Sequence, residues 1–148
     1  MESYHTRQSN CEGPVTDHGP APFTANISYA AQQNQNFRTA FWTGQHLQMT
    51  LMSISPRCEI GLEMHPETDQ LIRVECGRAL VCIGTRKENL DLQCCLNAGD
   101  AVFVPAGAWH NIFNTGNCPL KLSSVYAPPR HPYGTVQNEK KRGTAKEN

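Results

Sequence analysis

Hydrophobic and polar residues alternate along the middle of the chain in short stretches, which is the pattern of β-strands. Glycine, proline, asparagine and aspartate separate these stretches and mark turns. We expect strands at 39–43, 46–55, 59–65, 70–76, 79–85, 90–96, 101–104, 109–114 and 120–126. Many short strands with close turns and little helical periodicity predict an all-β fold, either a sandwich or a barrel.

The two ends of the chain lack this alternation. Residues 1–35 are rich in Gln, Asn, Pro and Gly, and 30–36 favours a short helix at most. The proline-rich run after Tyr126 cannot form a central strand, because proline removes a donor from the hydrogen-bond ladder. We therefore expect an N-terminal arm over 1–35, a β-barrel domain over 36–127, and an extended cover with a polar tail over 128–148.

Composition and charge narrow the function. The chain has 148 residues, which suits one domain, and its 13 basic residues balance 13 acidic ones. This balance argues against nucleic acid or an anionic membrane as a partner. We find neither an apolar run of about 20 residues, as a membrane span needs, nor the apolar core of a signal peptide. We expect a cytoplasmic protein whose seven cysteines, which form no C-x-x-C, are free thiols.

The most informative spacing lies in residues 99–114. It reads G-x5-P-x-G-x2-H-x3-N, and its fixed positions are Gly99, Pro105, Gly107, His110 and Asn114. This pattern resembles the second signature motif of the cupin superfamily at every fixed position. The resemblance implies a double-stranded β-helix, or jelly-roll barrel. The motif's glycines, proline and asparagine are expected to shape turns, and His110 is expected to bind a metal.

Residues 57–77 resemble the first cupin motif, G-x5-H-x-H-x3,4-E-x6-G, with three departures. Arg57, Glu63 and Gln70 stand where the motif has Gly, His and Glu, whereas His65 and Gly77 match it. Positions i and i+2 of a strand share a face, so both donors of H-x-H can point into the barrel.

The ligand set that the resemblance implies is Glu63, His65, Gln70 and His110. Two nitrogen and two oxygen donors with one negative charge favour Mn, Fe, Ni or Zn over Cu as the divalent ion. Asp69, next to Gln70, could reach the metal instead if the turn before it differs by one residue.

Two classes of function stay open. One is a metal-dependent enzyme on a small sugar, carbonyl or aromatic substrate, because residues 36–138 resemble small bacterial cupins labelled isomerase-like or dioxygenase-like. The other is a non-catalytic small-ligand-binding or sensor cupin. The candidate acid–base groups are Glu63, Asp69 and Tyr126. Scattered arginines argue against a phosphosugar isomerase; they are Arg38, Arg57, Arg73 and Arg78.

A small barrel leaves edge strands that need cover. The expected strand 39–43, with Phe41 and Trp42, is a candidate to pack on, or exchange with, a second subunit. Cupins of this size are commonly dimers, so we expect a homodimer.

Overall fold

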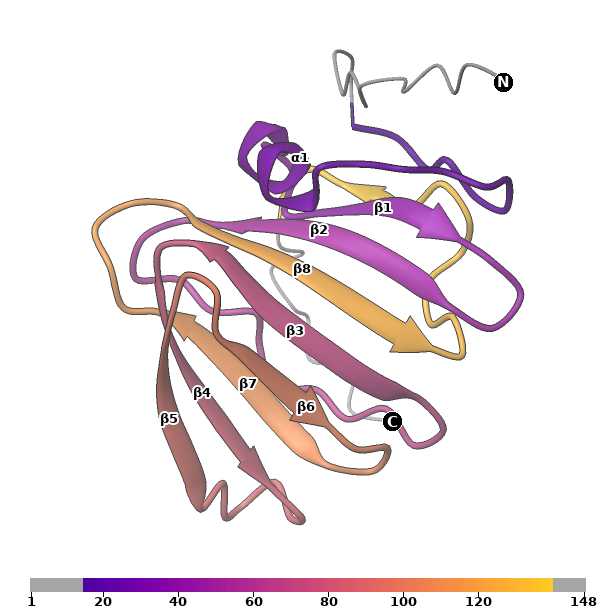
Figure 1. Ribbon diagram of the computed structural model, residues 1–148. Helices are drawn as coiled ribbons and strands as arrows, with labels where there is room; N and C mark the ends of the chain where they lie inside the picture. Colours follow the sequence, from indigo (N-terminus) through magenta and orange to yellow (C-terminus); the bar gives the residue numbers. More distant parts are fainter. Residues whose placement is uncertain (1–14, 140–148) are drawn as a thin grey trace, which may run out of the picture.

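The computed structural model describes residues 15–139, and two antiparallel β-sheets form its body (Figure 1). The larger sheet has the strand order β6-β3-β8-β2-β1-β9, and the smaller one has the order β5-β4-β7. In chain order the elements are α1 (Ile27–Gln33), β1 (Arg38–Thr43), β2 (Gln48–Ile54), β3 (Asp69–Cys76), β4 (Arg78–Gly84), β5 (Leu92–Asn97), β6 (Ala101–Val104), β7 (Trp109–Asn114), β8 (Leu120–Ala127) and β9 (Val136–Gln137). The predicted all-β class is confirmed.

The main core lies between the two sheets, because alternate side chains of each strand point inward. On β2, Met52 and Ile54 belong to this core. Leu51, on the opposite face of the same strand, packs against Ala30 and Ala31 of α1. Figure 1 shows α1 over the larger sheet, on the side away from the smaller sheet. The predicted short helix is therefore present, although it begins three residues before the run at 30–36.

The expected strand at 59–65 is not a strand but an irregular segment. It makes only two isolated bridges, from Glu59 to Phe113 and from Glu63 to His110. Gly61 has a φ of 106°, which breaks the extended conformation between the two bridges. At the other end of the chain, the proline-rich run after β8 is irregular, and β9 then adds two unpredicted residues beside β1.

Strand β1 is covered by its own chain. Its edges pair with β2 and β9, so it is not an edge strand. On its outer side, Phe41 packs edge-on against Phe23, with ring centroids 5.5 Å apart. Trp42 donates its indole hydrogen to the carbonyl of Ala21 over 2.8 Å. The surface that we expected to meet a second subunit is thus occupied by the segment before α1.

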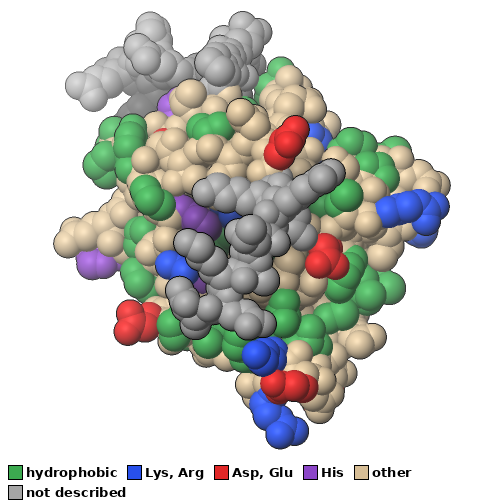
Figure 2. Space-filling model, turned by 180° about the vertical axis from the view of Figure 1, so that it is seen from behind, with side chains coloured by type: hydrophobic (Ala, Val, Ile, Leu, Met, Phe, Trp, Pro, Cys, Tyr) green, Lys and Arg blue, Asp and Glu red, His purple; other side chains and the backbone are tan. Residues whose placement is uncertain are grey.

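The surface charge is mixed. Acidic and basic side chains are scattered over the face that Figure 2 shows, with no continuous patch of either sign. The six cysteines in the described part of the chain are free. Across residues 15–139, no helix has the length and apolar character needed to span a membrane.

Candidate metal centre

Three of the four expected ligands come together between the sheets. Glu63 and His110 exchange two backbone hydrogen bonds of 2.9 Å, which fasten the irregular segment to β7. His65 follows two residues later, and its carbonyl accepts a hydrogen bond from the backbone N–H of Gly107 over 2.8 Å. The side chains of Glu63, His65 and His110 offer ligand atoms that all lie within 4.8 Å of one another.

The hydrogen bonding of His110 fits a divalent cation. The Nε2 atoms of His65 and His110 are both buried and have no hydrogen-bond partner. Nδ1 of His110 lies 3.0 Å from the carbonyl oxygen of Ala108. Because a carbonyl only accepts, Nδ1 carries the hydrogen and Nε2 presents its lone pair to the cluster. Histidine ligands of metals are commonly oriented in this way.

The charges of the cluster also favour a cation. Burial opposes ionisation of Glu63, but the polar contact with His65 and the charge of Arg38 outweigh it and lower the pKa of the carboxyl. Glu63 Oε1 lies 3.7 Å from Arg38 Nη2, and Oε2 lies 3.6 Å from His65 Nε2. Burial lowers the pKa of His110. At neutral pH the cluster therefore holds a carboxylate and a neutral His110 imidazole, the forms that bind metal ions.

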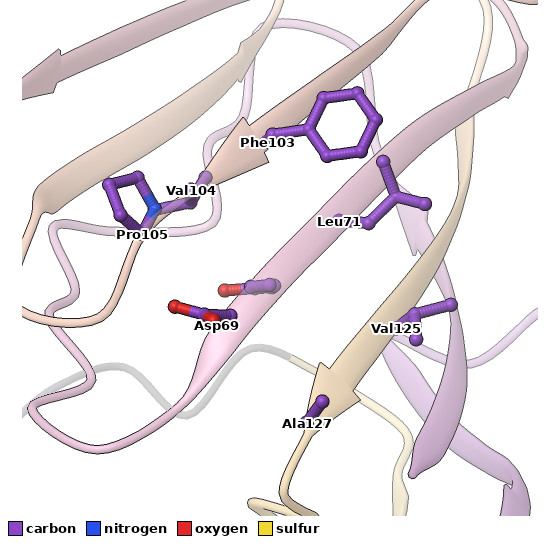
Figure 3. Close-up of a pocket in the computed structure, with 8 residues that line it drawn as sticks. Asp69, Leu71, Phe103, Val104, Pro105, Val125 and Ala127 are labelled. Atoms are coloured by element: carbon purple, nitrogen blue, oxygen red, sulfur yellow. The ribbon is translucent and has the colours of Figure 1, made fainter.

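Gln70, the fourth expected ligand, points into the interior from the start of β3. Its Nε2 donates to Ser124 Oγ over 2.8 Å, whereas its carbonyl oxygen is buried and has no partner. Asp69, the alternative ligand, is exposed, and its Oδ1 accepts from the backbone N–H of Ala106 over 2.9 Å. Figure 3 shows its carboxylate beside the loop at Pro105. The turn before β3 thus has the register that turns Gln70 inward and Asp69 outward.

Tyr126, a candidate acid–base group, lies beside the cluster. The side chain is fully buried, and its ring centroid is 5.9 Å from that of His65. Its hydroxyl has no hydrogen-bond partner. The ring of His131 meets Tyr126 edge-on, with centroids 5.1 Å apart.

Sequence reasoning missed three further groups at this centre. Arg38 is buried on β1 and pairs with Glu63, although the arginines looked scattered in the sequence. Arg130 donates from Nε to Nδ1 of His65 over 3.1 Å, and His131 follows it. Arg38 shares strand parity with buried Ala40, so starting the expected strand one residue earlier would have marked it as inward-facing. The irregular segment of Arg130 and His131 offers no such signal.

Comparisons with known proteins agree with this architecture. Residues 50–126 match a family model described as Cupin domain. Protein YrkC of Bacillus subtilis (strain 168) is 52% identical over 133 residues, which cover 90% of this chain and 72% of the relative. Protein L612 of Acanthamoeba polyphaga mimivirus is 36% identical over 115 residues, covering 77% of this chain and 70% of the relative. Neither name states an activity.

A solved structure matches over most of the fold. The crystal structure of BH2720 from Bacillus halodurans has a TM-score of 0.84 and 56% sequence identity to this chain. The match covers 85% of this chain and 96% of that chain. Together with the two sheets and the matched motif positions, these similarities show that the chain belongs to the cupin family.

Proposed function

We propose that this cupin is a metal-dependent enzyme in which Glu63, His65 and His110 hold a divalent cation, with Gln70 as an additional oxygen donor. The observation that carries the proposal is the convergence of three ligand atoms within 4.8 Å. Two of the residues supply Nε2 atoms that are buried and unpartnered; that of His110 presents its lone pair, and that of His65 can do so once Arg130 leaves Nδ1. The mixture of nitrogen and oxygen donors favours Mn²⁺, Fe²⁺, Ni²⁺ or Zn²⁺.

The chemistry would be shared between the cation and nearby side chains. A divalent cation bound here supplies Lewis acidity at a substrate oxygen, and iron would add the capacity to bind dioxygen. The buried hydroxyl of Tyr126 has no partner and is placed to hold or donate a proton at such an oxygen. Burial and the charge of Arg38 lower the pKa of His131 to about 4, so this imidazole is neutral near pH 7 and can accept a proton.

The substrate class we propose is a small sugar, carbonyl or aromatic compound, transformed in an isomerase-like or dioxygenase-like reaction. The interior position of the cluster supports a small substrate. Glu63 serves as a metal ligand in this proposal, so Tyr126 and His131 are the acid–base candidates that remain free. Asp69, which caps the loop at Ala106, has no role in the reaction.

A second candidate function is a non-catalytic cupin that binds a small ligand without a metal. One observation favours it: both carboxylate oxygens of Glu63 already face a positive or hydrogen-bonding group, Arg38 at Oε1 and His65 at Oε2. The cluster can therefore balance the charge of Glu63 without an added cation.

Metal content separates the two candidates. Untagged wild type, His110→Ala and a control, His46→Ala, are compared by mass spectrometry; His46 is exposed before β2. An enzyme of the proposed kind retains about one ion per chain in wild type and His46→Ala and loses it in His110→Ala. Iron would favour oxygen chemistry, whereas Zn, Mn or Ni would favour Lewis-acid chemistry. No metal in any of the three, even after incubation with each ion, would favour the metal-free binder.

We also propose that the protein is a homodimer, with its contact at the outer face around β6. Strand β6 is an edge of the larger sheet, and Phe103 on it is 76% exposed. Figure 3 shows Phe103 beside Leu71 of β3 and Val125 of β8, and these residues line a shallow apolar pocket. An exposed apolar edge strand is a template for pairing with another chain. Two copies of β6 could pair about a two-fold axis.

A further inference from the structure

The charges around the donor cluster do not balance. Two guanidinium groups reach it from different elements, Arg38 from β1 and Arg130 from the segment after β8. Among the described residues, Glu63 is the single carboxylate that forms an ion pair with either of them. Glu67 lines an outer pocket with Arg130 but is exposed, and no ion pair joins it to that guanidinium in the described part of the chain. A divalent cation would add two further positive charges.

Several buried polar groups of the residues around the cluster also lack partners. They include Nε of Arg38, the hydroxyl of Tyr126 and the carbonyl oxygen of Gln70. Their residues are only 5%, 0% and 5% exposed. Buried polar groups in folded proteins are almost always paired, so a group of unpaired ones indicates where the polar atoms of a ligand belong.

The types of these groups specify the ligand. Guanidinium nitrogens only donate, and they match the oxygens of a carboxylate. Nη1 of Arg38 donates to Gln137 Oε1 over 2.7 Å and Nη2 faces Glu63, so Nε is the donor that Arg38 has left for a ligand. The terminal nitrogens of Arg130 have no hydrogen-bond partner among the described residues, and its side chain is exposed at the edge of the site. The Gln70 carbonyl oxygen has two lone pairs and only accepts, so beside a cation it can also accept a hydrogen bond from a donor such as a hydroxyl. The Tyr126 hydroxyl can donate to the same ligand.

We propose that the centre binds a small hydroxy-carboxylate, with the carboxylate held by Arg38 and Arg130 and the hydroxyl group facing Gln70 and Tyr126. This inference deepens the proposed function and rests on it for the location of the substrate. The anionic ligand supplies the negative charge that two arginines and a divalent cation require. A phosphate group is also an oxyanion, and the test separates the two.

The test measures ligand binding by NMR titration of wild-type protein, both metal-free and loaded with Zn²⁺. The probes are L-lactate, its neutral amide lactamide, and inorganic phosphate. We expect lactate to bind about tenfold more tightly than lactamide, since only lactate carries the charge. Equal affinities for lactate and lactamide would overturn the anion site. Phosphate binding more tightly than lactate would overturn the assignment to a carboxylate.

Two variants assign the binding to these residues. Arg130→Gln should weaken lactate binding about tenfold, whereas the matched control Arg78→Gln should not change it. Arg78 is exposed and pairs through its backbone with Asn97, while His110 pairs with Ile83 at the other end of β4. Tyr126→Phe keeps the ring and should weaken lactate binding several-fold. Unchanged affinity in both Arg130→Gln and Tyr126→Phe would overturn the proposal.

The affinity for Zn²⁺, measured on the same samples, separates this inference from the proposed function. If wild type binds Zn²⁺ but not lactate, the carboxylate site is wrong and the metal centre stands. If wild type binds lactate through Arg130 but does not bind Zn²⁺, the carboxylate site stands and the metal-dependent function is wrong.

Discussion

Arg130 donates from Nε to Nδ1 of His65 over 3.1 Å, and this contact sets the tautomer of a candidate metal ligand. A guanidinium only donates, so Nδ1 of a neutral His65 must accept and its ring hydrogen must lie on Nε2. His110 has the reverse arrangement, because its Nδ1 donates to the carbonyl of Ala108. Only His110 therefore presents a free Nε2 lone pair in this conformation. A cation can bind Nε2 of His65 only after Arg130 has moved away.

Arg130→Gln should consequently strengthen metal binding. A glutamine carbonyl can accept a hydrogen bond from Nδ1, which favours the tautomer with a free Nε2 lone pair. We expect about tenfold tighter Zn²⁺ binding, a size typical of changes at groups that orient metal ligands. Competition with a chromophoric chelator measures the affinity, and Arg78→Gln serves as the matched control. Weaker binding in Arg130→Gln would mean that Arg130 orients His65 for the metal instead of competing with it.

Gln70 provides a test of the fourth ligand. Gln70→Glu replaces the amide that donates to Ser124 Oγ with a carboxylate, which can accept from that hydroxyl instead, and it should tighten Zn²⁺ binding about tenfold through the added charge. Gln70→Leu removes the oxygen at similar volume and should weaken binding. Chelator competition on both variants gives the result, with circular dichroism as a control for folding. Zn²⁺ affinity that is the same in wild type and both variants would exclude Gln70 as a ligand.

Asn114, the last position of the second motif, should be structural. Its Nδ2 donates to the carbonyls of Ile54 and Cys118 over 2.9 and 2.8 Å, and its Oδ1 accepts from Gly116 N–H over 2.9 Å. Asn114→Ala removes all three bonds and should lower the free energy of unfolding by about 2–3 kcal/mol. Urea titration measures this loss, and exposed Asn117→Ala is the control. A fully stable variant that has lost Zn²⁺ binding would contradict the structural role.

The parts of the site that were predictable are those that local sequence determines. Gly99 and Gly107 have φ angles of 93° and 84°, and such turns favour glycine at fixed distances from the strand that carries His110. Glu63 and His65 are two residues apart, and their side chains reach the same cluster although the segment is not a strand. Motif spacing predicted these positions because the local conformation of each depends on the few residues around it.

The rest depends on contacts between distant parts of the chain. Arg130 is 65 residues from His65, and the proline-rich run around it has no periodicity that indicates where a side chain points. Asp69 and Gln70 could not be told apart, because one residue of turn length decides which of them faces inward. The packing of Phe41 and Trp42 against the segment at 18–23 could not be predicted, because nothing in the sequence links the two.

Acid should destabilise the protein through His131. Burial and the charge of Arg38 lower the pKa of His131 from 6.5 to about 4, so between these values the unfolded chain binds more protons than the folded chain. Stability is therefore full above about pH 6.5 and falls as the pH drops toward 4. His110, whose pKa burial also lowers, acts in the same direction.

Urea titrations of metal-free protein at pH 7 and pH 5 measure this effect. The free energy of unfolding should fall less between pH 7 and pH 5 in His131→Gln than in wild type. In the control His46→Gln it should fall as much as in wild type. The fall should not vanish, because His110 remains in both variants. A pH dependence equal to that of wild type in His131→Gln would show that His131 does not contribute to it.

Phe103 should control assembly. Phe103 lies on edge strand β6 and is 76% exposed. This is the largest exposed fraction among the large hydrophobic residues in the described part of the chain. If β6 pairs with a second copy, burying this ring stabilises the dimer, and Phe103→Ser should shift the protein toward the monomer. Light scattering at micromolar concentration measures the mass. Leu92→Ser is the matched control, because Leu92 is 55% exposed on β5, an edge of the smaller sheet. A monomeric wild type would contradict the homodimer, and a dimer that persists in Phe103→Ser would place its contact elsewhere.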